Sequence, residues 1–304
     1  MKRFAKSSVL SLAKRRSRLS SASVSGSLLG LLGIDFDSTQ DYHYPGGCTA
    51  ACVISIDFDH ITKSLLQGST RWYPKPIEEL LMKNKNGTKE MVGLADKYRI
   101  PMTWAICGRT AEEDQESYRS ILRADTKHEI GVHTYSHADV ASCSSEELES
   151  EVAKCLEVLA VAEHPKTFIF PWNRSGHFDL LKQMGFETFR DQRRAVGAPR
   201  DHLGLVNIPP TYYVDTKSYG AFPLIKHYLE FCISWNSVFH LWLHPWGVVF
   251  DSMDTSGRFV RETLDPLFSY IKKKRDDGKL AVCTMGELAT FWKKRQETVM
   301  RKLG

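Results

Sequence analysis

The chain has 304 residues, of which 42% are hydrophobic and 25% charged, and no residue type is in gross excess. These values fit one large α/β domain or two small ones, with ample length for a substantial core. The formal charge is +5, but seven basic residues precede the first acidic residue, Asp35, so the rest of the chain carries −2. A nearly neutral body does not indicate a nucleic-acid groove, and we expect no nucleic-acid partner.

Residues 1–47 are predicted to be a tail that precedes a folded domain of residues 48–304. The tail is basic, rich in serine and free of acidic residues up to position 34, which is typical of a disordered segment. The same composition fits a transit peptide or a surface helix on anionic lipid, whereas 25–34 is only a short apolar stretch for a secretory signal. No apolar run approaches the roughly 20 residues that span a bilayer.

The seven cysteines are scattered along the chain, and none of them forms a Cys-x-x-Cys pair. This pattern indicates neither a disulfide framework nor a structural zinc knot. We therefore expect a cytoplasmic location, with any membrane contact made peripherally through the basic tail.

From residue 50 onward, short apolar runs alternate with helical patterns. Strands are predicted at 50–56, 101–106, 128–133, 166–171, 186–190, 204–208, 237–244 and 279–283. Helices are predicted at 88–99, 145–162 and 285–303, and the last two begin with the capping boxes Ser144–Glu147 and Thr284–Glu287. Two segments, 60–87 and 191–203, are predicted to be polar loops, and the first is long enough for a lid.

The alternation of strands and helices predicts an α/β fold with a mostly parallel sheet covered by helices. Seven to eight such units can form an open doubly wound sheet or a (β/α) barrel. Polar groups directly follow four of the predicted strands, namely Asp57 with Asp59, His133 with His137, Pro171-Trp172-Asn173, and His244. A barrel brings all strand carboxyl ends to one face, where catalytic groups gather, so we favour the barrel.

Asp59, His133 and His137 form a familiar three-ligand set for a catalytic divalent metal. If the two histidines lie on one helical turn, their Cβ atoms are roughly 5–6 Å apart. Mixed nitrogen and oxygen ligands suit one Zn²⁺ ion, with Co²⁺, Ni²⁺ and Mn²⁺ as alternatives. Two histidines at this spacing are also common by chance on a surface, but the carboxylates at a strand end favour the metal site. Asp57 is then free to act as a base.

In this order, the motifs resemble those of the polysaccharide deacetylase family (carbohydrate esterase family 4, nodulation-factor deacetylase-like). The similarity includes its Asp-x-Asp branch, with peptidoglycan-deacetylase-like and allantoinase-like members. Besides the groups above, it rests on Thr103-Trp104-Ala105 and His128-Glu129-Ile130-Gly131. The resemblance covers about residues 50–295. It implies a distorted (β/α) barrel, a divalent metal and hydrolytic removal of an acyl group from nitrogen or oxygen, which makes 48–304 the catalytic domain.

Carried over residue by residue, the resemblance assigns the general base to Asp57 and the general acid to His244. It assigns the metal to Asp59, His133 and His137, and an oxyanion contact to the backbone N–H of Trp172. Trp172 and Trp246, next to these motifs, are further candidates for stacking on a sugar. Alternation along 239–244 places His240 and Trp242 on the same face as His244, with His240 deeper in the barrel.

One position departs from the family pattern. The arginine that usually stands two residues before the proline, and orients the base carboxylate, is replaced by Ile169. We therefore expect Arg174, three residues after Pro171, to reach back to Asp57 and do the same electrostatic work.

The leading prediction is a metal-dependent hydrolase that removes an N-acetyl or O-acetyl group from a sugar or a polysaccharide precursor. One alternative is hydrolysis of a small cyclic amide, which would suit a lidded pocket rather than an open groove. Another is a non-catalytic carbohydrate-binding protein on the same scaffold. Asp57 favours an enzyme, because a protein that only binds sugar needs no base.

Overall fold

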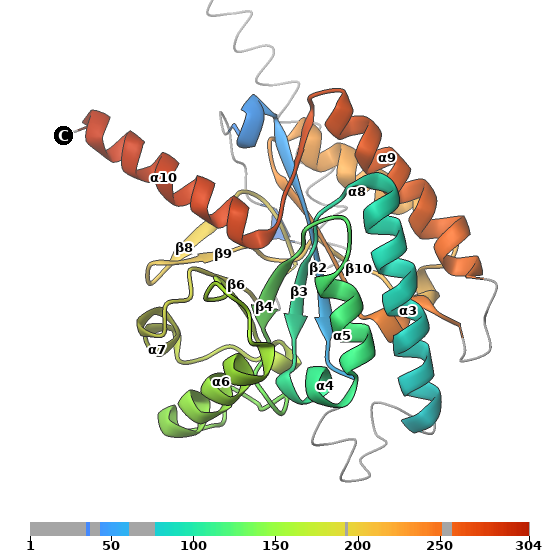
Figure 1. The fold of residues 1–304 in the computed structure, drawn as a ribbon. Coiled ribbons are helices and arrows are strands. Elements are labelled where there is room, and N and C mark those ends of the chain that lie inside the picture. Colours follow the sequence, from blue (N-terminus) through green and yellow to red (C-terminus); the bar gives the residue numbers. More distant parts are fainter. Residues whose placement is uncertain (1–34, 37–42, 61–76, 192–193, 251–256, 304) are drawn as a thin grey trace, which may run out of the picture.

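The computed structural model describes residues 35–36, 43–60, 77–191, 194–250 and 257–303 (Figure 1). Most of the predicted N-terminal tail, and residues 61–76 of the predicted lid, lie outside the described residues. Tyr44, by contrast, is buried in the core, and its hydroxyl donates to the Asn236 carbonyl oxygen at 3.0 Å. The folded body therefore includes residues that precede the boundary expected at residue 48.

A long curled sheet forms the centre of the molecule, in the strand order β10-β11-β2-β3-β4-β5-β6-β9-β8, with β12 also paired to β2 (Figure 1). Its neighbours are parallel except for β8 and β9. The strands are β2 Ala50–Phe58, β3 Thr103–Ile106, β4 Glu129–Val132, β5 Thr167–Ile169, β6 Thr188–Arg190, β8 Arg200–His202, β9 Leu205–Asn207, β10 Tyr212–Tyr213, β11 Val238–Leu243 and β12 Leu280–Val282. A separate pair joins β1 Asp35–Phe36 to β7 Ala195–Val196. The predicted distorted (β/α) barrel is confirmed, in an incompletely closed form.

Helices pack on the outside of this sheet (Figure 1). They are α3 Ile77–Tyr98, α4 Gly108–Glu113, α5 Gln115–Leu122, α6 Ser145–Leu159, α7 Phe178–Gln183, α8 Phe222–Ser234, α9 Asp265–Asp276 and α10 Met285–Leu303. Short 3-10 turns are η1 Pro45–Gly47, η2 Pro171–Asn173, η3 Thr216–Ser218 and η4 Pro245–Val248, and a π-helical turn, η5 Val260–Leu264, leads into α9. Both predicted capping boxes form, at the starts of α6 and α10. Among the described helices, none combines the length and apolar character needed to cross a bilayer.

Strand β2 is buried along its whole length, since all nine of its residues are buried. Its even-numbered side chains join the large apolar cluster under the helices. Its odd-numbered side chains belong to a second cluster at first, with Ala51 and Val53, and then become polar at Ser55, Asp57 and Asp59. A strand buried on both faces is what a parallel sheet covered by helices requires. The polar residues at its carboxyl end therefore depart from the apolar pattern of the strand.

Two predicted loops are wrong where the structure describes them. Residues 77–87 belong to α3, although the Asn-Lys-Asn-Gly sequence at 84–87 has low helix propensity. Tertiary packing outweighs that propensity, since Asn84 is fully buried. The second predicted loop, 191–203, contains β7 and β8, the latter paired antiparallel with β9.

Helix α3 approaches η4 so closely that Gly87 faces the Pro245 backbone. A Cβ atom at Gly87 would lie 1.9 Å from the Pro245 carbonyl oxygen, whereas one at Gly93 would meet nothing within 4 Å. Only glycine permits a contact of this kind. Because η4 directly follows His244, this contact supports one wall of the site described next.

Candidate metal centre and catalytic site

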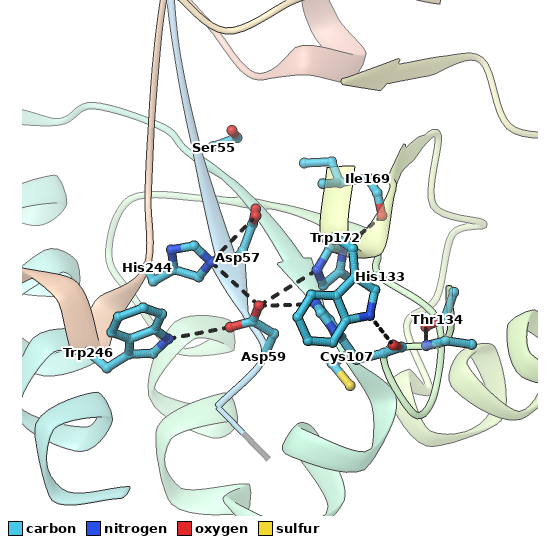
Figure 2. Close-up of polar contacts among 12 residues, drawn as sticks. Ser55, Asp57, Asp59, Cys107, His133, Thr134, Ile169, Trp172, His244 and Trp246 are labelled. Carbon is cyan, nitrogen blue, oxygen red and sulfur yellow. Dashed lines mark hydrogen bonds and ion pairs between the residues drawn. The ribbon is translucent and has the colours of Figure 1, made fainter. Parts of the chain in front are cut away.

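Side chains from several strand ends meet at the carboxyl face of the curled sheet (Figure 2). Asp57 lies in β2 and Asp59 directly after it, His133 follows β4, and His244 follows β11. The two aspartate side chains are 4% exposed, and those of His133 and His244 are 1% and 13% exposed. The fold thus brings together polar groups that are as much as 187 residues apart in the sequence.

The ligand atoms of Asp59, His133 and His137 all lie within 4.8 Å of one another. Asp59 Oδ2 is 3.3 Å from His137 Nε2 and 3.9 Å from His133 Nε2. The two imidazole rings meet edge to face, with centroids 4.9 Å apart. A buried group of one carboxylate and two imidazoles fits Zn²⁺ or a similar first-row ion.

His133 is held in the tautomer that a metal ligand needs. Its Nδ1 donates to the Ile169 carbonyl oxygen at 2.7 Å, which leaves the lone pair on Nε2. Burial lowers the pKa of His133 to about 4, so the ring is neutral at pH 7. The buried Nε2 has no hydrogen-bond partner and faces a carboxylate. Such an arrangement is unfavourable unless a cation lies between the two groups, so this atom supports a metal site.

The two candidate histidine ligands lie on an irregular loop and not on the helical turn considered from the sequence. Thr134 and His137 adopt positive φ angles of 56° and 62°. Non-glycine residues in this region store backbone strain, which persists only where surrounding contacts enforce it.

Glu151 of α6 provides those contacts. Its carboxylate accepts hydrogen bonds from the backbone N–H groups of Tyr135 and Ser136, at 3.0 and 2.7 Å, and from the Ser136 hydroxyl at 2.7 Å. Glu112 reaches the same loop only through the exposed Tyr135 hydroxyl. Glu151 therefore provides three of the hydrogen bonds that hold the loop of the candidate ligands.

Asp57 is paired with an arginine that the sequence analysis missed. Arg190, the last residue of β6, donates from Nη1 to Oδ1 at 2.8 Å and from Nη2 to Oδ2 at 2.5 Å. Its side chain is fully buried, and its guanidinium lies 4.3 Å from the centre of the Trp242 ring. Burial disfavours the charged form of Asp57, but Arg190, together with His133 and His244, outweighs burial and lowers the pKa of this carboxyl group. Asp57 is thus ionised and oriented, as a general base must be.

Arg174 does not reach Asp57 as predicted. Its Nη1 lies 2.6 Å from Asp139 Oδ2, and its side chain is 56% exposed. The reason is that η2 places Arg174 beside this surface acid, while Arg190 already occupies both oxygens of Asp57. The available sequence signal was the position of Arg190 at the end of the predicted strand 186–190.

His244 faces both carboxylates (Figure 2). Its Nε2 is 3.5 Å from Asp59 Oδ2 and 3.9 Å from Asp57 Oδ2, and its Nδ1 is 3.5 Å from the Tyr213 hydroxyl. Burial opposes protonation of the ring, but Asp59 and Asp57 outweigh burial and raise the pKa of His244. A histidine whose protonated form is favoured in this way suits the role of general acid.

Two partly exposed tryptophans wall the site. The Trp172 ring centroid lies 4.6 Å from that of His137, and its Nε1 donates to the His137 carbonyl oxygen at 3.2 Å. The Trp246 ring centroid lies 4.6 Å from that of His244, and its Nε1 donates to Asp59 Oδ1 at 3.5 Å. Both residues therefore lie next to the candidate catalytic groups, where the sequence placed them.

Fold and site together define the class: a barrel-like α/β protein with an Asp-His-His group, a second paired carboxylate and a histidine at its strand carboxyl ends. Residues 52–187 match the family model of the polysaccharide deacetylases. Over these residues, the resemblance seen in the motifs is confirmed. Arg190 and His244 lie beyond the matched residues.

A peptidoglycan deacetylase of Helicobacter pylori is 27% identical to the chain over 136 residues. The aligned region covers 43% of this chain and 46% of that protein, so the chain spans about half the length of this curated relative.

Solved structures share the fold over most of the chain. A structure described as a polysaccharide deacetylase from Mycobacterium smegmatis has a TM-score of 0.67 at 18% identity and covers 86% of this chain and 96% of its own. One from Pseudomonas aeruginosa has a TM-score of 0.67 at 15% identity, with 83% and 93% covered. The Puue allantoinase has a TM-score of 0.64 at 16% identity, with 82% and 92% covered. At these identities the likeness establishes the fold.

Proposed function

We propose that the protein is a metal-dependent hydrolase that removes an N-acetyl or O-acetyl group from a sugar or a polysaccharide precursor. The observation that carries the proposal is that two neighbouring carboxylates, Asp57 and Asp59, contact different kinds of side chain. Asp59 faces two buried histidines, whereas Asp57 is paired through both oxygens with the buried Arg190. A protein that only bound a carbohydrate would need no ionised, oriented base beside a metal site.

Asp59, His133 and His137 would hold the divalent ion, with Zn²⁺ favoured by the mixed ligands. When bound, such an ion acidifies a coordinated water and polarises the substrate carbonyl. Asp57, kept ionised by Arg190, accepts the proton of the attacking water. His133 stays neutral because it is buried, so it does not compete for that proton.

His244 would then give a proton to the departing amine or alcohol, since Asp59 and Asp57 raise its pKa and favour the protonated ring. The family resemblance assigns the backbone N–H of Trp172 to the developing oxyanion, where a fixed donor stabilises charge. The rings of Trp172 and Trp246 flank the site and can stack on a sugar face.

Acetate release tests the proposal. Peptidoglycan fragments and N-acetylated oligosaccharides would be offered to metal-stripped protein, to the same protein with Zn²⁺ restored, and to Asp57→Asn protein loaded with Zn²⁺. Asp57→Asn leaves the three candidate ligands intact, so it should bind Zn²⁺ with unchanged stoichiometry and yet release no acetate. Arg174→Met, which alters a surface ion pair, serves as the control and should remain active.

Each outcome bears on a different part of the proposal. Metal-dependent release that Asp57→Asn abolishes would support both the reaction and the base. Stoichiometric Zn²⁺ binding without acetate release would reject acetylated sugars, and small cyclic amides would be tested next. Failure to bind any of the four candidate metals would reject the enzyme and leave a sugar-binding role.

A further inference from the structure

A second polar layer lies beneath Asp57, inside the curled sheet. Arg190 Nη1 donates to Ser55 Oγ at 2.9 Å as well as to Asp57. Ser55 Oγ in turn lies 2.8 Å from His240 Nε2, and His240 Nδ1 lies 2.9 Å from the Ile208 carbonyl oxygen. The side chains of Ser55 and His240 are both fully buried. A continuous chain of hydrogen bonds therefore runs from the base to the backbone after β9.

The direction of each hydrogen bond in this chain can be worked out. A carbonyl oxygen only accepts, so His240 Nδ1 carries a hydrogen and donates to Ile208. Burial, with a smaller contribution from Arg190, lowers the pKa of His240 to about 3, so the ring is neutral and Nε2 has a free lone pair. The Ser55 hydroxyl must then donate to Nε2, which leaves its oxygen lone pairs to accept from Arg190.

The direction of the Ser55 hydrogen bonds affects how the Arg190 guanidinium is held. Ser55 accepts from the same Nη1 nitrogen that donates to Asp57, while the ring of Trp242, which is the register partner of Ser55 in β11, covers the guanidinium face. Without the His240 acceptor, the Ser55 hydroxyl hydrogen would be free to turn toward Arg190 and replace an attraction with a repulsion. His240 thus sets the polarity of Ser55, and Ser55 sets the orientation of Arg190.

A purely structural role explains this arrangement poorly. A buried serine–histidine pair costs desolvation that apolar side chains would avoid, and each polar group is tolerated only because the next one satisfies it. Elsewhere on the same strand the inward side chains, Ala51 and Val53, are apolar. The polar pair begins only where the strand approaches the base.

We propose that Ser55 and His240 are positioning residues for the hydrolysis, which act by holding the Arg190 guanidinium so that both oxygens of Asp57 stay paired. This inference rests on the proposed function, in which Asp57 is the base. Neither residue needs to touch the substrate or the metal, so their loss should lower kcat and leave KM and metal affinity unchanged.

The test uses the Zn²⁺-loaded full chain and four variants. Ser55→Ala should lower kcat about tenfold, the effect of losing one hydrogen bond to a charged group. His240→Gln places an amide oxygen where Nε2 accepts, whereas His240→Asn keeps a donor near Nδ1 and offers Ser55 no acceptor. The asparagine variant should therefore be as slow as Ser55→Ala, and the glutamine variant faster than both. Ser237→Ala, at a buried serine that donates only to the Trp235 carbonyl, is the control and should keep kcat.

A double-mutant cycle shows whether the effect passes through Arg190. In an Arg190→Lys background, Ser55→Ala should lower kcat by less than about twofold, because the bidentate pair is already lost. A full tenfold loss in that background, a change confined to KM, or equal losses in Ser55→Ala and Ser237→Ala would overturn the proposal.

The same cycle separates this inference from the proposed function. If the wild-type protein hydrolyses none of the substrates, the proposed function fails, and urea unfolding of the metal-free variants decides the inference. Non-additive effects of Ser55→Ala and Arg190→Lys on the unfolding equilibrium constant, coupled by about tenfold, would support the contact chain. Additive effects would overturn it.

Discussion

Replacing Arg190 with methionine should destabilise the protein much more than the same replacement at Arg174. The Arg190–Asp57 pair is buried, with side chains 0% and 4% exposed, so Arg190→Met leaves an uncompensated carboxylate in the interior. Breaking a buried pair in this way costs about 3–5 kcal/mol. In the Arg174–Asp139 pair, the arginine side chain is 56% exposed. Surface ion pairs of this kind contribute about 0–1 kcal/mol to stability.

Urea unfolding of the metal-free proteins at pH 7 measures this difference, because bound metal would add its own stabilisation. A second measurement at lower pH checks the cause. Since the folded-state pKa of Asp57 is lowered, its contribution is present above the unfolded-state value of about 3.9 and is lost as pH falls through the folded-state value. The deficit of Arg190→Met relative to wild type should therefore be largest at pH 7 and shrink below about pH 4. Equal stabilities of the two methionine variants at pH 7 would refute the reasoning.

Three further outcomes are expected. Glu151→Gln should weaken Zn²⁺ binding by about 10- to 100-fold in a competition titration, because the loop of the candidate ligands loses hydrogen bonds to the carboxylate. Glu112→Gln should leave the Zn²⁺ affinity unchanged, and equal affinities of the two variants would contradict the prediction. Gly87→Ala should lower the free energy of unfolding by about 1–3 kcal/mol, because the added Cβ atom would collide with η4. Gly93→Ala should raise the free energy of unfolding by up to about 1 kcal/mol, and a lower stability of both variants would argue against the contact. Stability of the metal-free protein should fall between about pH 6.5 and 4, because His128, His133 and His240, whose pKa values are lowered by burial, gain protons on unfolding. His240→Gln should reduce the slope of stability against pH by up to about 1.4 kcal/mol per pH unit, and an unchanged slope would show that His240 does not contribute to it.

The sheet could be predicted from the sequence because its strands are buried parallel strands. Such strands appear as short apolar runs, and each predicted run became a strand in the structure. The candidate ligands were found for the same reason, since polar residues at the ends of apolar runs are conspicuous. Helix α3 was partly missed because Asn84 and Gly87 are poor helix formers, and their suitability depends on η4, which lies more than 150 residues further along the chain.

The partner of Asp57 was missed for a different reason. Arg174 was chosen because it lies near the expected motif position in the sequence, but the actual partner is 133 residues from Asp57. Which strand faces β2 across the interior depends on how the sheet curls, and the local pattern of β6 carries no information about that. The charge of Arg190 was visible in the sequence, whereas its position opposite Asp57 was not.

Under the proposed function, the contacts make metal binding and positioning of the base separable. The ligand loop is fixed by Glu151 from α6, whereas the base is fixed by Arg190 from β6 and, through Ser55 and His240, by β2 and β11. Asp57 lies in β2 and Asp59 directly after it, so each takes its role from the side chains that face it rather than from its own strand. A change at Glu151 should therefore alter metal affinity and leave kcat of the metal-loaded protein constant. A change at Arg190, Ser55 or His240 should lower kcat and leave metal affinity constant. A variant of Glu151 that lowered kcat at saturating Zn²⁺ as much as Ser55→Ala would show that the two sets are coupled through β2.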